Sequence, residues 1–330
     1  MEHIRFGIIG CGKVTENKSG PAIQKALGSS LDMVMRRDEG KLISYAQRHG
    51  IPRYTTDYLQ LLGSPDIDAV YIATPPDTHA FYTVEAARHG KAVYVEKPMA
   101  LTVKECREMI KACGEAGVPL YVAYYRRGQP KFLKAKELLD SGIIGQVLSF
   151  NYLFACPPPD IDPERLWLLK KEKAGGGLLY DIGSHMVDTL FFLLGEPLEV
   201  TGRSANLSRK HGTNDTSSAL FCFASGIQGT MQLSFSAAEQ IDRLWISGST
   251  GSLTLSIMSN DPIQLLKDGE TTYFRFEPIQ HVQQPYIEMV VRCLLGKEKI
   301  DSSGKSALLT QEILEAIDSD STWTVSHNAV

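Results

Sequence analysis

The chain has 330 residues, a length that suits two domains better than one hydrophobic core. Its 43% hydrophobic and 22% charged residues are typical of a globular protein, and its net charge of -4 argues against a general nucleic-acid binder. No apolar run approaches the roughly 20 residues that span a bilayer, and no secretory leader is predicted. We therefore expect neither a nucleic-acid nor a membrane partner.

Six cysteines are scattered along the chain without a CxxC pair or a regular spacing. In a chain of this size, that pattern predicts reduced and mostly buried thiols in a cytoplasmic protein. We expect no metal site from them. The six are Cys11, Cys106, Cys113, Cys156, Cys222 and Cys293.

Short apolar runs alternate with helical patterns up to about residue 123. Strands that are apolar throughout and separated by helices indicate a parallel sheet covered on both faces. We predict a doubly wound, Rossmann-type dinucleotide-binding domain over residues 1–123. Its predicted strands are 6–9, 33–35, 69–73, 92–95 and 120–123, and a clear helical pattern covers 102–116.

The pattern changes after residue 123, and we predict a second domain of the α+β class over residues 124–330. Within 200–276, apolar and polar residues alternate as in a largely antiparallel sheet with one open face. The last helix is a candidate to pack back on the first domain. The expected elements are helices over 130–139, 175–194, 283–295 and 305–317, and strands over 147–154 and within 200–276.

The first predicted strand ends in a glycine turn, Gly10-Cys11-Gly12. Glycines at these positions let the backbone bend sharply and approach a pyrophosphate, whose charge then meets the amides of Lys13 and Val14 at a helix start. A lone GxG is weak evidence, but here it ends a strand and opens a βαβ series. The third glycine of the usual fingerprint is missing, because Thr15 stands there, and a new helix start follows at Ser19-Gly20-Pro21.

The end of the second predicted strand bears on the choice of cofactor. An acidic residue there bonds the ribose 2′-hydroxyl of NAD, whereas arginine accommodates the 2′-phosphate of NADP. The chain has Arg36 and Arg37 at this place, followed by Asp38. We favour NADP over NAD. A solvated charge cluster is the alternative, and Asp38 reaches the ribose if the loop is short.

Two further segments follow predicted strands at the edge where such folds bind ligands. Thr74 and Pro75, with His79 just beyond, are expected to line the cofactor site, unless they form only a rigid loop. Glu96 and Lys97 follow 92–95 and precede Pro98, a candidate for a cis peptide. The Lys97 ammonium is suited to bond a substrate oxygen near the nicotinamide. Taken alone, an ordinary surface lysine is the commoner explanation.

Asp181 and His185 stand four residues apart in the segment that begins with the glycine triplet 175–177. On a helix this spacing places them on the same face, one turn apart. Histidine exchanges protons near neutral pH, and a carboxylate beside it can orient it or bind a substrate hydroxyl. An incidental surface pair is the alternative. Gly183 weakens that alternative, since a glycine inside a helix costs ~1 kcal/mol and suggests close approach by another group.

The chain resembles the Gfo/Idh/MocA oxidoreductases, named for glucose–fructose oxidoreductase and inositol dehydrogenase. The resemblance rests on the GxG turn, Thr74-Pro75-Pro76-x-x-His79, Glu96-Lys97-Pro98 and G-G-G-x-x-x-D-x-G-x-H ending at His185. It implies hydride exchange between NAD(P) and a sugar, polyol or related carbonyl compound. It also implies that Lys97 binds the reacting oxygen, that His185 accepts or donates the proton, and that Asp181 holds substrate and histidine. Members commonly form dimers or tetramers through the open sheet face.

One departure from this pattern concerns the substrate. Many members carry a Trp-Arg pair upstream of the glycine triplet, whereas Trp167 is followed here by Leu168. Trp167, Tyr125 and Arg126 are our candidates for substrate contacts. Two other functions suit the same fold: an NAD-dependent glycoside hydrolase, and a regulator that senses NADP or sugar without catalysis. The complete set of Lys97, Asp181 and His185 favours the oxidoreductase, but the sequence does not name its substrate.

Overall fold

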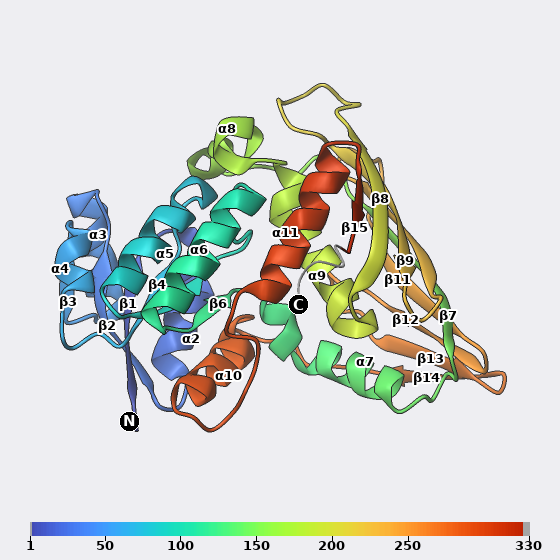
Figure 1. The fold of residues 1–330 in the computed structure, drawn as a ribbon, viewed down its shortest axis with the longest axis horizontal. Helices are drawn as coiled ribbons and strands as arrows, with labels where there is room; N and C mark the ends of the chain where they lie inside the picture. Colours follow the sequence, from blue (N-terminus) through green and yellow to red (C-terminus); the bar gives the residue numbers. More distant parts are fainter. Residues whose placement is uncertain (1, 326–330) are drawn as a thin grey trace. The chain divides into compact units, whose positions relative to one another are not determined.

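The computed structural model describes residues 2–325, without the side chain of Glu164. The chain divides into two compact units, which we describe separately. The first unit contains the residues up to Gln129 together with Ile279–Leu309, and the second contains Pro130–Pro278 and the residues from Thr310 onward. Helix α11 (Lys305–Asp318) therefore begins in the first unit and continues in the second (Figure 1).

Within the described residues, the first unit is built on a six-stranded parallel sheet in the order β3-β2-β1-β4-β5-β6. This order confirms the predicted doubly wound fold. β3 is absent from the predicted apolar runs because it is short, lies at the sheet edge and exposes Tyr54. The strands are β1 (Ile4–Ile9), β2 (Ser29–Met35), β3 (Arg53–Thr55), β4 (Ala69–Ile72), β5 (Ala92–Val95) and β6 (Leu120–Val122).

Helices cover both faces of this sheet, which explains why its central strands are apolar throughout. One buried cluster joins the sheet to α2, α3 and α10, and the other joins it to α4, α5 and α6. A strand that is buried on both sides lacks the alternation of apolar and polar residues that a half-exposed strand shows. The helices are α1 (Lys13–Asn17), α2 (Ser19–Lys25), α3 (Glu39–His49), α4 (Tyr58–Leu62), α5 (His79–Arg88), α6 (Val103–Ala116) and α10 (Gln284–Leu294).

Helix α10 reaches the first unit from far along the chain. The sequence analysis places residues 283–295 within 124–330, but Tyr286, Ile287, Val290 and Val291 pack into the core of the first sheet. The spacing of apolar residues identifies a helix and its buried face, but it does not say which sheet that face covers. The first unit is therefore completed by a segment that follows the second.

The second unit contains, among the described residues, a nine-stranded sheet in the order β14-β13-β12-β11-β7-β10-β9-β8-β15. Its neighbours pair antiparallel except β7 and β10, which are parallel, so the predicted largely antiparallel sheet is confirmed. The strands are β7 (Val147–Ala155), β8 (Pro197–Ala205), β9 (Thr216–Phe223), β10 (Gln228–Ser234), β11 (Ile241–Gly248), β12 (Gly251–Leu255), β13 (Ile263–Lys267), β14 (Glu270–Phe274) and β15 (Thr322–Thr324).

One face of this sheet is covered and the other is open. On the covered side, Phe191 of α9 (Ser184–Leu194) lies 6.5 Å from Phe221 between ring centroids, and α7 (Pro130–Asp140) packs against α9. In β10, Met231 and Leu233 are buried and Thr230 is exposed, as the alternation predicts. From residue 2 to residue 325, no helix has the length and apolar character that crossing a membrane requires.

Candidate functional site

The glycine turn after β1 has the geometry that a pyrophosphate site requires. Gly10 has a φ of +96°, and a Cβ there would lie 2.7 Å from Cγ2 of Thr74. A Cβ on Gly12 would meet no described atom within 4 Å, so only the absence of a side chain keeps this space open. Gly12 also precedes α1, whose first residues are Lys13 and Val14. The turn therefore fits the diphosphate of a dinucleotide.

Thr15 replaces the third glycine without loosening the turn. It is fully buried, and its Oγ1 donates to the carbonyl oxygen of Gly12 at 2.8 Å. Its own carbonyl oxygen accepts from the hydroxyl of Tyr45 at 3.1 Å. A Cβ on Gly20 would lie 2.3 Å from that carbonyl oxygen. The close packing expected from a third glycine is thus supplied by Gly20 in α2, which the sequence analysis marks only as a helix start.

The three charged residues after β2 differ in their surroundings. The Arg36 guanidinium donates to the carbonyl oxygen of Cys11 inside the glycine turn, whereas Arg37 is exposed. Asp38 caps α3, because its Oδ1 accepts from the amide of Lys41 at 3.0 Å. One carboxylate oxygen of Asp38 is therefore engaged at a helix start rather than left for a ribose.

An aromatic cluster that the sequence analysis missed lies near Arg37. Tyr58 of α4 and Phe81 and Tyr82 of α5 pack edge to face, with ring centroids 5.1–5.5 Å apart. Burial raises the pKa of Tyr82, and the charge of Arg37 opposes that rise. Phe81 is half exposed. Because Tyr58 follows β3 and the other two follow β4, the cluster joins loops at the carboxyl edge where the adenosine half of a dinucleotide binds in this fold.

His79 connects two loops through its two ring nitrogens. Its side chain is 1% exposed, its Nε2 lies 2.8 Å from the carbonyl oxygen of Thr74, and its Nδ1 lies 3.0 Å from that of Pro98. Burial lowers the pKa of His79, while these carbonyl oxygens favour its protonated form. These contacts give His79 a role in joining the two loops. Thr74 and Pro75 follow β4 after one intervening residue, Ala73.

Glu96 anchors the backbone beside Lys97. Its Oε1 accepts from the Tyr71 hydroxyl at 2.5 Å and from Nε2 of Gln283 at 2.6 Å, and its Oε2 lies 3.2 Å from the Lys97 amide. Glu96 is 8% exposed, and these contacts hold its carboxylate inside the fold. The Lys97–Pro98 peptide is cis. Gln283 precedes α10 and lies 187 residues from Glu96 in sequence, and no pattern in the sequence predicts this contact.

Asp181 and His185 lie where one helix type changes to another. A π-helical turn, η4 (Leu179–Gly183), contains Asp181 and is followed by α9, which contains His185 in its first turn. The predicted helix is present up to Leu194, but it begins with this π-helical turn, because apolar spacing does not distinguish i→i+4 from i→i+5 hydrogen bonding. His185 is 4% exposed. A Cβ on Gly183 would lie 3.0 Å from Cδ1 of Leu179.

Asp181 has an ion partner that the sequence analysis missed. Nη2 of Arg165, in the 3-10 helix η3 (Pro163–Leu169), lies 2.7 Å from Oδ2 of Asp181. Trp167 lies in the same helix and is partly buried, and Leu168 is buried. In the first unit, Tyr125 and Arg126 are both buried, with the Arg126 guanidinium 5.3 Å from the Tyr125 ring centre. The candidate residues thus form two groups, one in each unit.

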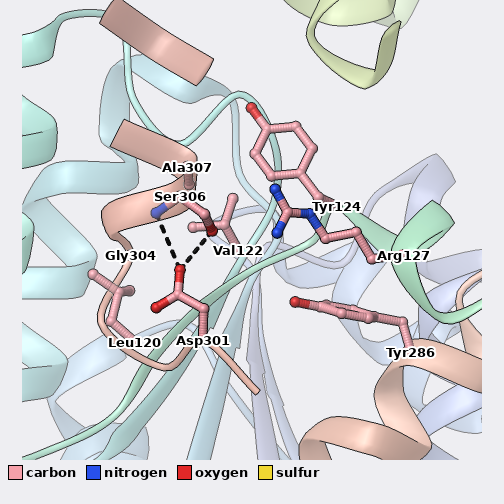
Figure 2. A pocket seen from close by; sticks show the side chains of 9 residues that line it. All are labelled: Leu120, Val122, Tyr124, Arg127, Tyr286, Asp301, Gly304, Ser306 and Ala307. Atoms are coloured by element: carbon pink, nitrogen blue, oxygen red, sulfur yellow. Dashed lines mark hydrogen bonds between the residues drawn. The ribbon is translucent and has the colours of Figure 1, made fainter. Parts of the chain in front are cut away.

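A small pocket lies in the first unit, and the predicted site residues do not line it. Figure 2 shows the Arg127 guanidinium beside Tyr124 and the carboxylate of Asp301 turned toward Ser306. The pocket lies between the end of β6 and the residues around the start of α11. Its lining is Leu120, Val122, Tyr124, Arg127, Tyr286, Asp301, Gly304, Ser306 and Ala307.

Comparisons with known proteins agree with both units. Residues 4–124 match the model of the oxidoreductase family with an NAD-binding Rossmann fold, and residues 132–254 match the GFO/IDH/MocA C-terminal domain. Oxidoreductase P35 of Formosa agariphila is 36% identical over 94% of this chain and 97% of its own. The 1,5-anhydro-D-fructose reductase of Ensifer adhaerens is 31% identical over 78% of each chain. The solved aldose–aldose oxidoreductase of Caulobacter crescentus, complexed with glycerol, is 27% identical with a TM-score of 0.85, covering 98% of this chain and 100% of its own.

Proposed function

Because this chain belongs to the Gfo/Idh/MocA oxidoreductase family, we propose that it transfers hydride between NAD(P) and a sugar, polyol or related hydroxy or carbonyl compound. The observation that carries the proposal is the joint presence of an open glycine turn, Lys97 two residues after β5, and Asp181 with His185 around the start of α9. The relatives reported above are named as reductases and oxidoreductases, which does not favour a hydrolase or a non-catalytic regulator.

Each of the three residues has a distinct role in this proposal. In the oxidation direction, His185 removes the hydroxyl proton and the Lys97 ammonium stabilises the developing charge on the oxygen. Asp181 holds the substrate and orients His185. The bound nicotinamide supplies the acceptor for the hydride. Glu96 supports this arrangement from inside the fold, since it anchors the Lys97 amide and is itself held by Tyr71 and Gln283.

The test is a panel of aldoses, inositols and anhydro sugars, assayed by nicotinamide absorbance with both cofactors. We expect Lys97→Ala and His185→Ala each to lower turnover by about 10²-fold or more, the order of general acid–base effects. Lys104→Ala in α6 and His89→Ala directly after α5, both at exposed positions, serve as matched controls with unchanged turnover. Near-normal rates in the Lys97 and His185 variants would remove both residues from the mechanism.

The preferred cofactor in this proposal is NADP. Arg36 donates to the glycine turn, and Arg37 next to it in sequence is exposed. One carboxylate oxygen of Asp38 accepts a hydrogen bond at the start of α3. Two guanidinium groups can pair with a 2′-phosphate, which NAD lacks. We expect a lower dissociation constant for NADPH than for NADH, and a loss of that preference in Arg37→Ala. Tighter binding of NADH by the unaltered protein would overturn the assignment.

We also propose that the protein resides in the cytoplasm and that it forms a homo-oligomer. None of the six cysteines, all within residues 2–325, forms a disulfide, and four of them are buried, as suits the reducing cytoplasm. The open face of the second sheet carries large exposed side chains in one cross-strand row: Trp245, Leu220 and Tyr273. Exposed apolar groups on a flat sheet face suit contact with a second copy of the same face. We infer a homodimer or homotetramer formed through this sheet.

A further inference from the structure

Gln283 places its side-chain amide against the carboxylate of Glu96, inside the first unit. It is 1% exposed, and its Nε2 donates to Oε1 of Glu96 at 2.6 Å. Its own Oε1 accepts from the hydroxyl of Tyr94 at 3.3 Å. An ionised carboxylate only accepts hydrogen bonds, so the NH2 end of the amide faces Glu96 and the oxygen end faces the phenol. The Gln283 amide therefore bridges these two groups in a single orientation.

The helix that begins after Gln283 does not use this side chain. Gln283 is the N-cap residue of α10, yet its side chain makes no capping hydrogen bond to that helix. Serine, threonine, aspartate and asparagine are the usual capping residues, and a cap contributes about 1 kcal/mol. A glutamine at this position is therefore better explained by its contact with Glu96 than by the stability of α10.

The segment that contains Gln283 has a second contact with the first unit two residues earlier. His281 is 9% exposed, with its Nε2 2.8 Å from Nζ of Lys25 and its Nδ1 2.9 Å from the carbonyl oxygen of Asn17, at the end of α1. A lysine ammonium only donates, so Nε2 accepts from Lys25 and Nδ1 donates to Asn17. His281 thereby keeps Gln283 within reach of Glu96.

Glu96 connects this segment to Lys97. Its Oε2 lies 3.2 Å from the Lys97 amide nitrogen, and its Oε1 accepts from Tyr71 and Gln283. A buried carboxylate that loses a donor is destabilised unless it moves toward another one. Such a movement would shift the Lys97 amide that is bonded to Glu96. A displacement of about 1 Å at a reacting group can lower a rate about 10²-fold.

We propose that Gln283 is a positioning residue for hydride transfer, and that it acts through Glu96 to hold Lys97 at the reacting oxygen. The inference rests on the proposed function, in which the Lys97 ammonium stabilises the charge that develops on this oxygen. That charge is largest in the transition state. The loss of Gln283 should therefore lower kcat rather than raise KM.

The experiment compares Gln283→Met with the unaltered protein, using NADP and the substrate that the sugar and polyol panel shows to be used best. Methionine keeps the length of the side chain and removes the donor. We expect kcat to fall about tenfold, while KM for the substrate and the dissociation constant of NADPH change by less than about twofold.

Gln129→Met is the matched control. Nε2 of Gln129 donates to the carbonyl oxygen of Val282 at 3.0 Å, so this change also removes an amide bonded to the same segment. It leaves the contacts of Gln283 and His281 in place. We expect kcat to be unchanged.

Gln283→Glu gives a readout that a role in packing alone would not change. Two carboxyl groups at the distance of this contact do not both ionise, so they share one proton, which restores the hydrogen bond. At about pH 6, kcat relative to the unaltered protein should be higher in Gln283→Glu than in Gln283→Met. This advantage should decrease toward about pH 9, because the shared proton is lost as the pH rises.

The other titratable groups near Glu96 are common to all these proteins. Lys97 is bonded to Glu96 through its amide, and Tyr71, Tyr94 and His79 interact with it electrostatically. Burial raises the pKa of both tyrosines and lowers the pKa of His79. Their titration cancels when kcat of each variant is divided by that of the unaltered protein at the same pH.

Four results would count against the inference. An unchanged kcat in Gln283→Met, or an equal fall in Gln129→Met, would reject Gln283 as a positioning residue and leave the proposed function in place. A Gln283→Glu variant that matches Gln283→Met at every pH would do the same. If the unaltered protein binds NADPH but turns over no sugar or polyol, the proposed function itself fails, and this inference fails with it.

Discussion

Asp301 shows how a single residue can make an element depend on pH. Its carboxylate accepts from the amide and hydroxyl of Ser303, before α11, and from those of Ser306, in the first turn of α11. Figure 2 shows the contacts with Ser306. Burial by itself would raise the pKa of Asp301, but these donors outweigh it and the pKa is lowered from 3.8. A lowered pKa in the folded state means that the ionised carboxylate stabilises the fold above its unfolded pKa.

We therefore expect Asp301→Ala to lower the free energy of unfolding at neutral pH by about 1 kcal/mol, the usual contribution of a capping side chain. The difference between the two proteins should shrink as the pH falls through the lowered pKa of Asp301, below 3.8. Urea unfolding at a series of pH values measures it. A difference that stays constant down to about pH 3 would contradict the assignment of the effect to the carboxylate.

At the residue scale, sequence and structure agree best where chemistry alone identifies a side chain. The positions of Gly10, Gly12 and Lys97 are those expected, because a glycine turn and a lysine after a strand have few other uses together. His79 and Glu96, which the sequence predicts at the cofactor site, are both buried and hydrogen-bonded to backbone groups. The sequence does not distinguish a polar residue that faces the ligand from one that supports the loop, because both stand next to the same motif.

The π-helical turn before α9 contains Asp181 and sets the backbone geometry at this residue. Gly183 ends that turn, and a Cβ there would lie 3.0 Å from Leu179 and 3.2 Å from Leu233, both at Cδ1. Neighbours at these distances must shift to admit a methyl group. π-helical turns are rare and recur at functional sites. The glycine therefore serves close packing beneath the residues that we assign to catalysis.

We expect Gly183→Ala to lower the free energy of unfolding by about 1–3 kcal/mol, the range for overpacking a filled site. The matched control is Gly114→Ala inside α6, where a Cβ would meet no described atom within 4 Å. That change should instead stabilise the protein by about 0.5–1 kcal/mol, since alanine is the better helix former. Thermal and urea unfolding compare the two. If both substitutions raised the free energy of unfolding equally, the π-helical turn would have to accommodate the added methyl group without cost.

For the whole molecule, the open sheet face determines the expected assembly. Trp245, Leu220 and Tyr273 project from β11, β9 and β14 and are joined in one row by the strand register. Their exposed fractions are 37%, 46% and 53%. A charge placed in the middle of such a row would oppose burial of the face against a second copy.

The double variant Trp245→Glu with Leu220→Glu should sediment as a monomer, while the unaltered protein sediments as a dimer or tetramer. Leu27→Glu, at an 88% exposed position of the first unit, is the control and should leave the assembly unchanged. Sedimentation velocity at several concentrations makes the comparison. A monomeric unaltered protein, or a double variant that still assembles, would contradict the sheet face as the interface.

The amino-acid sequence predicts the fold of both units, the glycine turn and the catalytic candidates Lys97, Asp181 and His185. These features depend on local patterns: apolar periodicity, turn residues and short motifs that act within a few residues. Four contacts come from tertiary packing alone: α10 completes the first sheet, Gln283 holds Glu96, Gly20 supplies the packing expected of a third glycine, and Arg165 pairs with Asp181. Each of these contacts joins residues on separate elements. Their partners are set by how the elements pack, which no spacing along the chain encodes.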